Sequence, residues 1–433
     1  MNDLLRRIAS REALLTVVGL GYVGLPLAVE KAKAGFRVIG IDRNPTRVEQ
    51  VNRGENYIGD VVDEELFALA AAGRLRAVGD FSPVDDADCV CLCVPTPLDA
   101  HQQPNLQHLI GSLDALAAHL HPGMLLVLES TTYPGTTAEL VVPFLTRLGL
   151  TVGTDILVAF SPERVDPGNR RYSVRNTPKV VGGVTPACTE AAAALYEAVL
   201  DAPVVRVSSP GVAEMEKLLE NVYRNVNIAL VNELCQLCNK MGISVWEVIE
   251  AASSKPYGFA PFYPGMGPGG HCIPLDPWYL SWRAREFGFH TTLIEDAGRI
   301  NDAMPDYCVR RISGLLSARG KALSGARILL LGAAYKADVA DERESPALRL
   351  LVLLEREGAQ LRCADPLLPE ITVNGVRRAT EPLAPLLDWC DLAVVGAAHR
   401  AFDWAEIARR APLIFDTKNA LRSVSARETI ELL

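Results

Sequence analysis

The stretch Leu14-Leu15-Thr16-Val17-Val18-Gly19-Leu20-Gly21-Tyr22-Val23-Gly24 decides the fold of the first third of the chain. Its apolar half predicts a buried strand, and its glycines have the G-x-G-x-x-G spacing of a turn that opens a helix. Gly19 permits the tight turn, Gly21 lets the backbone approach a pyrophosphate, and Gly24 permits close packing of the helix on the strand. The helix N-terminus offers unpaired N–H groups to the anion. We therefore predict a dinucleotide-binding site at this turn.

An acidic residue after the second apolar run indicates which dinucleotide binds. Asp42 follows the predicted strand 36–41, close to the expected position about 20 residues beyond the last glycine. Its carboxylate can accept both ribose hydroxyls of NAD and repels a 2′-phosphate, although Arg43 beside it leaves NADP as an alternative. Thr96 and Thr131 follow later apolar runs, and ligands bind at such strand ends. The residues predicted to bind the cofactor are Gly19, Gly21, Tyr22, Val23, Gly24, Asp42, Arg43, Thr96 and Thr131.

Apolar runs alternate with helical stretches in the first and last thirds of the chain. Continuous apolar strands predict parallel sheets covered by helices on both faces. Between them, Ser209-Pro210 begins a helix and Gly242 ends it, as N-cap, first position and C-cap. Such a helix is roughly 45 Å long at 1.5 Å per residue. We predict an α/β fold with two Rossmann-like, doubly wound lobes joined by a central helical domain with a long spine helix. The predicted domains are residues 1–205, 206–318 and 319–433.

The composition limits the function classes. The chain has 433 residues, of which 49% are hydrophobic and 22% charged, and a formal net charge of −9. This acidic balance argues against a nucleic-acid binder, because no excess of cations is available to neutralise phosphates. No apolar run reaches transmembrane length, and the N-terminus does not resemble a signal peptide. We therefore expect a cytoplasmic protein that does not bind a membrane, with its 10 cysteines reduced and no metal site.

The segment Gly265-Met266-Gly267-Pro268-Gly269-Gly270-His271-Cys272-Ile273-Pro274-Leu275-Asp276 carries the strongest chemical signal. Its glycines let backbone N–H groups point at an anion or an oxyanion. A helix that begins after Pro274 would place the Cys272 thiol near its N-terminus, where the thiolate is favoured. Asp276 stands four residues beyond Cys272, so it can share a helical face with it. The alternative is a structural cysteine, and His271 is interpreted as structural or ligand-orienting rather than as a base.

Two further sets of polar residues are candidates for catalysis. On the predicted long helix, Lys217, Asn221 and Arg224 form one polar stripe, where a partly buried lysine can orient a water or stabilise an alkoxide. Glu163 ends another predicted strand and can act as a general base through water. The alternatives are a solvated charged helix face for the first set and a surface turn carboxylate for the second.

Six motifs occur in order along the chain. They are Gly19-Leu20-Gly21-Tyr22-Val23-Gly24-Leu25-Pro26, Ser130-Thr131-Thr132-Tyr133-Pro134-Gly135-Thr136-Thr137, Ser161-Pro162-Glu163-Arg164, the helix with Lys217 and Asn221, Gly269-Gly270-His271-Cys272-Ile273-Pro274-Leu275-Asp276, and Tyr335-Lys336 with Arg343-Glu344-Ser345-Pro346. Together they resemble the UDP-glucose/GDP-mannose dehydrogenase family, and most closely its UDP-N-acetylglucosamine 6-dehydrogenase branch. The resemblance spans Gly19 to about Lys418. It implies an NAD-binding lobe, a central region that forms a homodimer, and a C-terminal lobe that binds the UDP moiety.

The resemblance also implies roles for individual residues. Cys272 matches the nucleophile, and Glu163 matches the base for thioester hydrolysis. The other catalytic residues, which hold or position a water or stabilise the alkoxide, are Lys217, Asn221, Asp276 and Thr131. The residues implied in substrate binding are Glu163, Arg164, Lys217, Asn221, Tyr263, Gly269, Lys336 and Arg343.

These observations predict oxidation of the C6 hydroxymethyl group of UDP-N-acetylglucosamine to a carboxylate, with two NAD per turnover, for surface polysaccharide precursors. Oxidation to an aldehyde needs no nucleophilic cysteine, so the thiol indicates that the reaction continues to the acid. Pro268, His271 and Leu275 depart from the UDP-glucose enzymes. UDP-N-acetylmannosamine and UDP-glucose dehydrogenases are alternatives. A 3-hydroxy-acid dehydrogenase and a non-catalytic nucleotide-sugar-binding protein are remote ones.

Overall fold

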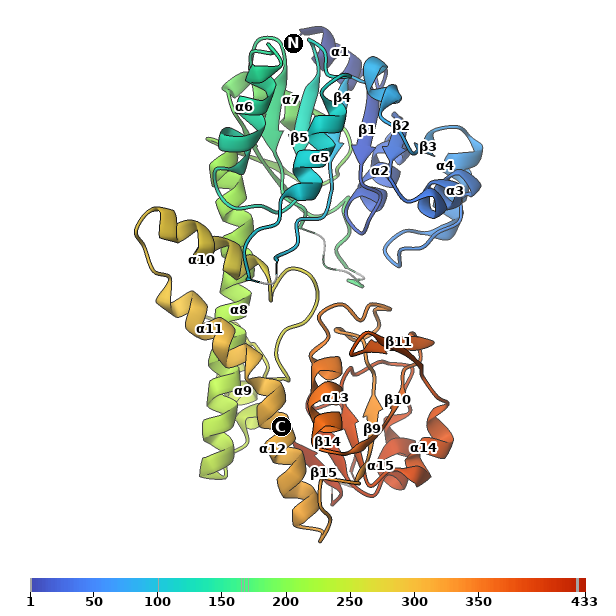
Figure 1. Cartoon of the computed structure of the whole chain (residues 1–433), viewed down its shortest axis with the longest axis vertical. Coiled ribbons are helices and arrows are strands. Elements are labelled where there is room, and N and C mark those ends of the chain that lie inside the picture. The colour runs from blue at the N-terminus through green and yellow to red at the C-terminus, as the bar shows by residue number, and fades with distance from the viewer. Residues whose placement is uncertain (1, 100, 165, 167, 170, 426–427) are drawn as a thin grey trace. The chain divides into compact units, whose positions relative to one another are not determined.

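The computed structural model describes the whole chain except Met1, Ala100, Val165, Pro167, Arg170, Ala426 and Arg427. The chain divides into two compact units. The first comprises Met1–Glu220 and Trp278–Phe289, and the second comprises Asn221–Pro277 and His290–Leu433. Figure 1 labels the helices and strands of both units.

The first unit is built on one eight-stranded sheet with the strand order β3-β2-β1-β4-β5-β6-β7-β8 (Figure 1). Its strands are β1 (Leu14–Val18), β2 (Arg37–Ile41), β3 (Leu75–Val78), β4 (Cys89–Leu92), β5 (Leu125–Leu128), β6 (Leu157–Phe160), β7 (Lys179–Gly183) and β8 (Val204–Val207). Its helices up to β8 are α1 (Asn2–Ala9), α2 (Gly24–Lys33), α3 (Pro45–Arg53), α4 (Asp63–Ala71), α5 (Gln107–Leu116), α6 (Val142–Arg147) and α7 (Pro186–Glu197), with short 3₁₀ and π turns at Ser82–Asp86 and Thr137–Val141.

Apolar side chains cover both faces of this sheet. Leu15 and Val127 belong to a buried cluster that includes side chains of α1, α2 and α7. Val90 and Leu126 belong to a second cluster that includes side chains of α5 and α6. Successive residues of a strand point to opposite faces, so the continuous apolar runs of the sequence are explained by burial on both sides. The doubly wound lobe predicted here is confirmed.

The sheet departs in one place from the parallel sheet that the sequence predicts. β6 and β7 pair antiparallel, with Ala159 opposite Gly183. Among the described residues of 161–178, none lies in a helix or a strand, and antiparallel neighbours need no helical crossover between them. The segment 161–164, which carries Glu163, is therefore a loop between two neighbouring strands.

The helix predicted over 210–241 is α8 (Pro210–Met241), with both ends as expected. The Ser209 hydroxyl accepts a hydrogen bond from the backbone N–H of Val212 at 3.3 Å, and Gly242 has a φ of +70°. The division between the two units falls within α8, after Glu220. The remaining helices of this central part are α9 (Val245–Ser253), α10 (Asp276–Glu286), α11 (Thr292–Asp302) and α12 (Met304–Ser317).

Helix α8 buries several polar residues and exposes many apolar ones. The buried polar residues are Glu214, Lys217, Asn221, Asn225 and Asn232. The exposed apolar residues are Val212, Met215, Leu219, Tyr223, Leu230, Leu234, Leu237 and Met241. A surface helix of a monomeric protein ordinarily has the opposite arrangement. Glu214 shows why the polar face is buried, because its carboxylate accepts hydrogen bonds from the backbone N–H groups of Gly135 and Thr137, at 2.6 and 2.9 Å, and from the Thr137 hydroxyl.

The second unit contains a five-stranded sheet with the order β10-β9-β13-β14-β15 and a two-stranded sheet, β11-β12. All pairs of the larger sheet are parallel. The elements are β9 (Arg327–Leu331), α13 (Pro346–Arg356), β10 (Gln360–Ala364), β11 (Glu370–Val373), β12 (Val376–Ala379), α14 (Leu383–Trp389), β13 (Leu392–Val395), α15 (Trp404–Arg410), β14 (Ile414–Asp416) and β15 (Ile430–Leu432). The predicted fold class, with two α/β lobes and a central helical region, is confirmed. Among the described residues, none of the helices has the length and apolar character that a bilayer crossing requires.

The two lobes repeat one local plan. In each lobe the first central strand ends at a glycine with a positive φ, +90° at Gly19 and +81° at Gly332. A carboxylate after the adjoining strand, Asp42 or Asp365, accepts the N–H of the residue that follows this glycine, at 2.8 and 2.7 Å. In the second lobe the buried His399 also contacts Asp365 at 3.2 Å.

Candidate active site

The glycine turn between β1 and α2 has the geometry that a dinucleotide requires. A Cβ atom at Gly24 would lie 1.8 Å from the carbonyl oxygen of Gly19, so only glycine permits this packing. Gly19 itself has a φ of +90°, and a Cβ atom there would lie 2.7 Å from the Cys93 carbonyl oxygen. At Gly21 an added Cβ would meet no protein atom within 4 Å. The backbone is therefore bare where a pyrophosphate would approach it.

Asp42 ties this turn to the second strand. It is 7% exposed, and its carboxylate accepts the backbone N–H groups of Leu20 and Asn44 at 2.8 and 2.9 Å. Arg47 contacts the same carboxylate at 3.4 Å, whereas Arg43 is exposed. A carboxylate has about four acceptor positions, so Asp42 retains capacity for a ribose hydroxyl. The turn and this carboxylate together fit NAD.

The two predicted threonines at the strand ends lie next to each other. The Thr96 hydroxyl donates to the carbonyl oxygen of Thr131 at 2.6 Å. The Ser130 hydroxyl donates to the Val94 carbonyl oxygen at 2.7 Å, and the Tyr279 hydroxyl of α10 donates to the Thr96 carbonyl oxygen. The loops that follow β4 and β5 are therefore fixed to each other at the carboxyl edge of the sheet.

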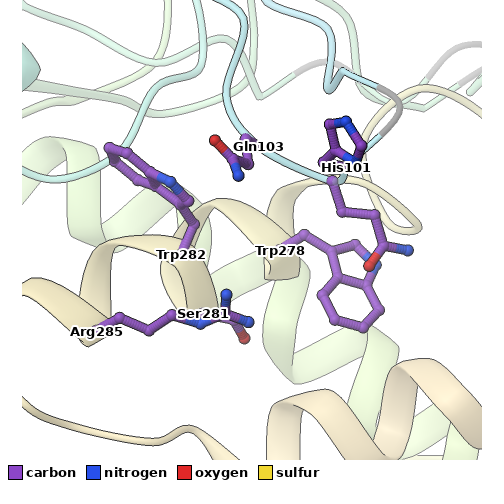
Figure 2. Close-up of a pocket in the computed structure, with 7 residues that line it drawn as sticks. His101, Gln103, Trp278, Ser281, Trp282 and Arg285 are labelled. Carbon is purple, nitrogen blue, oxygen red and sulfur yellow. The ribbon is translucent and has the colours of Figure 1, made fainter.

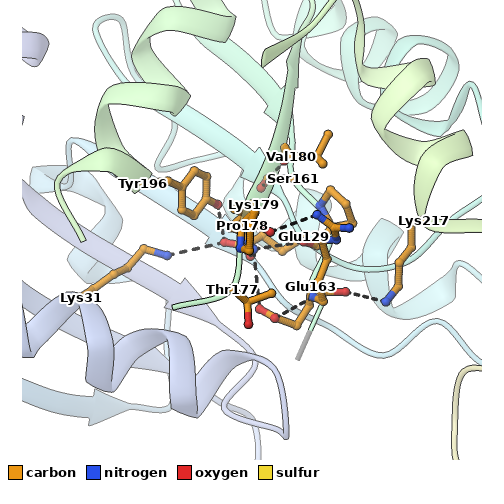
Figure 3. A network of polar contacts seen from close by, with 12 residues as sticks. Lys31, Glu129, Ser161, Glu163, Thr177, Pro178, Lys179, Val180, Tyr196 and Lys217 are labelled. Carbon is orange, nitrogen blue, oxygen red and sulfur yellow. Dashed lines mark hydrogen bonds and ion pairs between the residues drawn. The ribbon is translucent and has the colours of Figure 1, made fainter. Parts of the chain in front are cut away.

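Lys217 and Glu163 also lie together (Figure 3). The Nζ atom of Lys217 donates to the main-chain carbonyl oxygen of Glu163 at 2.5 Å. Lys217 is 6% exposed, and the Glu163 side chain is 14% exposed and lies 3.6 Å from the Nζ atom of Lys179. A solvated helix face and a surface turn carboxylate are therefore both excluded for these two residues. Their catalytic roles stay predictions.

Arg164 is held by two carboxylates of α8. Its guanidinium lies 3.4 Å from Glu216, contacts Glu220, and donates to the Pro178 carbonyl oxygen at 3.1 Å. Burial, together with the charge of Glu220, raises the pKa of Glu216 to about 7 although Arg164 opposes the shift. The loop that carries Glu163 is thus fixed to α8 at Glu163 itself and at the residue that follows it.

In the second unit, Asn221, Asp276 and Cys272 form a connected group. The Asn221 side-chain amide donates to the Asp276 carboxylate at 2.5 Å, and these residues are 0% and 4% exposed. The Asp276 N–H donates to the Cys272 carbonyl oxygen at 2.9 Å, which places the cysteine one turn before the first residue of α10. All ten cysteines lie in the described residues, and Cys272 is the exposed one among them.

The glycines before Cys272 pack closely against the loop after β9. A Cβ atom at Gly269 would lie 2.8 Å from Cβ of Tyr335. Gly270 has a φ of +80°, and its N–H donates to the Arg343 carbonyl oxygen at 3.2 Å. The Arg343 guanidinium pairs with Asp341 at 2.7 Å. The structure thus brings predicted substrate-binding residues from separate parts of the sequence to one place.

The remaining predicted residues flank this loop. The ring of Tyr263 is 55% exposed and stacks on Trp246 with the ring centres 5.9 Å apart. Lys336 follows Tyr335 directly and is half-buried. Burial lowers the pKa of His271, which favours its neutral form and agrees with a structural role rather than a role as a charged group.

Sequence comparison finds three consecutive domains of one family. The chain matches the NAD binding domain of the UDP-glucose/GDP-mannose dehydrogenase family over residues 13–200, its central domain over 211–303 and its UDP binding domain over 329–423. The chain belongs to this family. As a UDP-glucose/GDP-mannose dehydrogenase family member it uses NAD, two molecules per turnover, so the predicted cofactor is confirmed. The UDP binding domain also disfavours a 3-hydroxy-acid dehydrogenase.

Individual relatives agree on the family and differ in the sugar. The chain is 36% identical to a UDP-N-acetyl-D-glucosamine 6-dehydrogenase of Pseudomonas aeruginosa over 81% of this chain and 82% of the relative. It is 32% identical to a UDP-N-acetyl-D-mannosamine dehydrogenase of Pyrococcus horikoshii over 94% of this chain and 96% of the relative. A solved structure of the UDP-D-ManNAc dehydrogenase from Pyrococcus horikoshii superposes with a TM-score of 0.88 at 30% identity, covering 97% of this chain and 98% of that one.

Sequence reasoning missed four buried residues of this dehydrogenase. Next to Glu163 is a buried cluster whose members are joined by hydrogen bonds and ion pairs (Figure 3). Its members are Lys31, Glu129, Lys179 and Tyr196. Glu129 and Lys179 adjoin apolar strands, at the end of β5 and the start of β7. A charged residue next to a fully buried strand is the signal that could have identified them, because such charges are buried only when they are paired.

A small pocket of the first unit also lay outside the predictions. The residues that line it are His101, Gln102, Gln103, Trp278, Ser281, Trp282 and Arg285. Figure 2 shows the α10 side chains on one side of it and the 101–103 segment on the other. These lining residues lie more than a hundred positions apart in the sequence, so no local pattern indicates the pocket.

Proposed function

We propose that this dehydrogenase oxidises the C6 hydroxymethyl group of UDP-N-acetylglucosamine to the carboxylate, with Cys272 as the covalent carrier. The observation that carries the proposal is the exposed Cys272 thiol, one turn before α10 and beside the buried Asn221–Asp276 pair. A helix N-terminus favours a thiolate. An enzyme that stopped at the aldehyde would have no use for a nucleophile at this position.

The proposed residues divide the reaction into four steps. The glycine turn and Asp42 would hold NAD, which would supply the hydride acceptor for the two oxidations. In the first, Lys217 and a water on Asp276 offset the developing alkoxide charge. The Cys272 thiolate then adds to the aldehyde carbon and forms a thiohemiacetal, whose oxidation leaves a thioester. Glu163 finally takes a proton from the water that hydrolyses this thioester and restores the thiol.

The overall balance is fixed by this sequence of steps. One hydroxymethyl group and one water give one carboxylate, two hydrides leave with two NAD, and three protons are released. Thr131 would position the hydrolytic water, and Asn221 would orient Asp276 through the contact at 2.5 Å between them. Substrate binding is assigned to Glu163, Arg164, Lys217, Asn221, Tyr263, Gly269, Lys336 and Arg343.

Replacement of Cys272 by serine tests the covalent step. The wild type should form two NADH per sugar, whereas Cys272→Ser should form no carboxylate and bind NAD as the wild type does. Cys238→Ser, at a half-buried cysteine on α8, is the matched control and should keep both products. Normal formation of the uronate by Cys272→Ser, measured by mass spectrometry of the nucleotide sugar, would contradict the mechanism.

UDP-N-acetylmannosamine is the second candidate substrate. It is favoured by the Pyrococcus horikoshii relative, which matches over nearly the whole chain. We give precedence to UDP-N-acetylglucosamine because the relative of Pseudomonas aeruginosa has the higher identity, 36%. NADH counted from UDP-N-acetylglucosamine, UDP-N-acetylmannosamine, UDP-N-acetylgalactosamine and UDP-glucose will decide, since the true substrate should give the highest kcat/KM.

We further propose that the chain forms a homodimer through α8. The exposed apolar residues of this helix recur at intervals of three, four and seven positions along its length, so they form one continuous stripe. A stripe of this kind can pack against itself across a two-fold axis. Leu234→Glu, in the middle of the stripe, should convert a dimer into a monomer in light scattering. A monomeric wild type would contradict the proposal.

The domain division at residues 205 and 318 is also proposed. It is supported by the family domains, whose matches over 13–200, 211–303 and 329–423 leave each of these positions between two domains. Limited proteolysis should cut near residue 318, in the connection between α12 and β9, before it cuts within the domains. Early cleavage inside 13–200 would count against the division.

A further inference from the structure

Two contacts just before Glu163 fasten its loop to the start of β7. The Ser161 hydroxyl donates to the Val180 carbonyl oxygen at 2.8 Å, and the Nζ atom of Lys179 donates to the Pro162 carbonyl oxygen at 3.2 Å. The same Nζ atom lies 3.6 Å from the carboxylate of Glu163 (Figure 3). Lys179 therefore contacts both the main chain beside Glu163 and its reactive side chain.

Lys179 also contacts a cluster of buried polar residues. Its Nζ atom donates to the carboxylate of Glu129 at 2.8 Å, which also accepts the Tyr196 hydroxyl at 2.5 Å and lies 3.5 Å from the Nζ atom of Lys31. Each of these four residues is at most 4% exposed. Such a position leaves Lys179 little freedom to turn, so the place of its charge is fixed before any ligand binds.

The charge of Lys179 is maintained by its neighbours. Burial alone would lower the pKa of this amine, but the carboxylates of Glu129 and Glu163 outweigh burial and raise the pKa of Lys179 above its usual range. Lys31 lies close to the carboxylate of Glu129. Among the contacts described for the Glu163 carboxylate, Lys179 supplies the cation, at 3.6 Å.

We propose that Lys179 is the positioning residue of thioester hydrolysis: its buried cation fixes the Glu163 carboxylate that activates water. The proposal rests on the proposed role of Glu163. The proposal also explains why the cluster is buried. A cation that is anchored in the core stays beside Glu163 and cannot move to contact the substrate. Breaking one member of a buried pair is costly, so Glu129, Lys31 and Tyr196 serve to keep Lys179 in place.

The other charged groups around Glu163 do not replace Lys179. Arg164, on the same loop, pairs with Glu216 and Glu220. Lys217, on α8, donates to the main-chain carbonyl of Glu163 rather than to its carboxylate. Cys93, directly after β4, lies close enough to act on the charge of Lys179. Burial raises the pKa of that thiol well above its usual value, so it stays neutral.

Loss of the Lys179 charge should affect one step of the reaction. Lys179→Met removes the contact that holds the Glu163 carboxylate, so the carboxylate is no longer kept where it activates water. We expect hydrolysis of the thioester to become about tenfold slower, part of the roughly 10²-fold or more that a positioned general base contributes. Both oxidations should continue, so the thioester on Cys272 should accumulate.

Rapid quench with excess NAD, followed by mass spectrometry of the intact protein, measures this accumulation. Lys179→Arg keeps a cation and should restore hydrolysis. Lys33→Met is the matched control, since it removes a partly buried lysine of α2 that pairs with Glu30 and Glu65 outside the cluster, and it should hydrolyse the thioester as the wild type does. If Lys179→Met does not fold, Lys179→Gln keeps a hydrogen-bond donor without the charge and should show the same accumulation.

The outcomes separate this inference from the proposed function. Accumulation of thioester in Glu163→Gln, together with wild-type hydrolysis in Lys179→Met, would overturn the inference alone. Equal slowing in Lys33→Met would also overturn it, because the effect would then be a general one of lost positive charge. Normal acid formation by Glu163→Gln would overturn the role of Glu163 and the inference with it.

Discussion

An alanine at position 24 should weaken NAD binding by about a hundredfold, because it forces the cofactor turn apart. The Cβ atom of Gly24→Ala would lie 1.8 Å from the carbonyl oxygen of Gly19, and real contacts of this kind are at least 3.0 Å. Helix α2 and the turn must therefore separate by more than about 1 Å. A displacement of about 1 Å costs roughly a hundredfold at a binding constellation, or about 2.7 kcal/mol of binding free energy.

Two other glycines provide matched comparisons for the same substitution. An added Cβ at Gly21 meets no protein atom within 4 Å, so Gly21→Ala should fold normally and yet weaken NAD binding, since the methyl group would occupy the path of the pyrophosphate. Gly111, on the exposed surface of α5, is equally open. Gly111→Ala should leave NAD binding unchanged and stabilise the protein by up to about 1 kcal/mol.

Isothermal titration with NAD and thermal unfolding of each variant distinguish these cases. We expect Gly24→Ala to lose both affinity and melting temperature, Gly21→Ala to lose affinity alone, and Gly111→Ala to lose neither. Wild-type NAD affinity in Gly24→Ala would refute the reasoning, because the clash with Gly19 follows directly from the geometry of the turn.

Three further substitutions on α8 have defined outcomes. Glu214→Ala leaves the buried N–H groups of Gly135 and Thr137 without their acceptor, so a denaturant titration should show a loss of about 2–6 kcal/mol at 1–3 kcal/mol per group. Glu216→Gln should stabilise the protein at pH 8 and not near pH 4. The pKa of Glu216 is raised to about 7 in the folded state, so the charged side chain destabilises the fold as the pH rises from the pKa of the unfolded chain towards 7. Equal effects of the substitution at both pH values in thermal unfolding would count against this. Lys217→Ala should mainly lower kcat for NADH formation, since its charge acts in the transition state, and an unchanged kcat would exclude that role.

Regular local patterns predicted most of the fold. The apolar runs gave the strands β1, β2, β4, β5, β9 and β13 within about two residues, and the Ser-Pro start and glycine end gave α8. These features depend on neighbours in the sequence, which is why they can be read there. The antiparallel turn from β6 to β7 could not be predicted in this way, because strand direction depends on whether a helix intervenes, and segment 161–178 has no clear periodicity.

The sequence of α8 alone does not reveal which face of the helix is buried. Lys217 and Asn221 share a stripe that is as typical of a solvated face as of a catalytic one. The structure decides between them through partners that are distant in the sequence, such as Asp276 for Asn221. Lys179 was missed for the same reason, since its partner Glu129 lies 50 positions away.

The repetition of the strand–glycine–carboxylate plan in both lobes has a consequence for the exchange of NAD and NADH. In the second lobe, residues 332–345 separate β9 from α13, and His399 contacts Asp365, so the G-x-G-x-x-G turn after β1 has no counterpart after β9. Both oxidations then use the same cofactor turn. The NADH formed in the first oxidation must leave, and a second NAD must bind, before the half-oxidised sugar can be oxidised again. The family places NAD in the first lobe and the UDP moiety in the second. Exchange of the dinucleotide therefore need not release the sugar nucleotide.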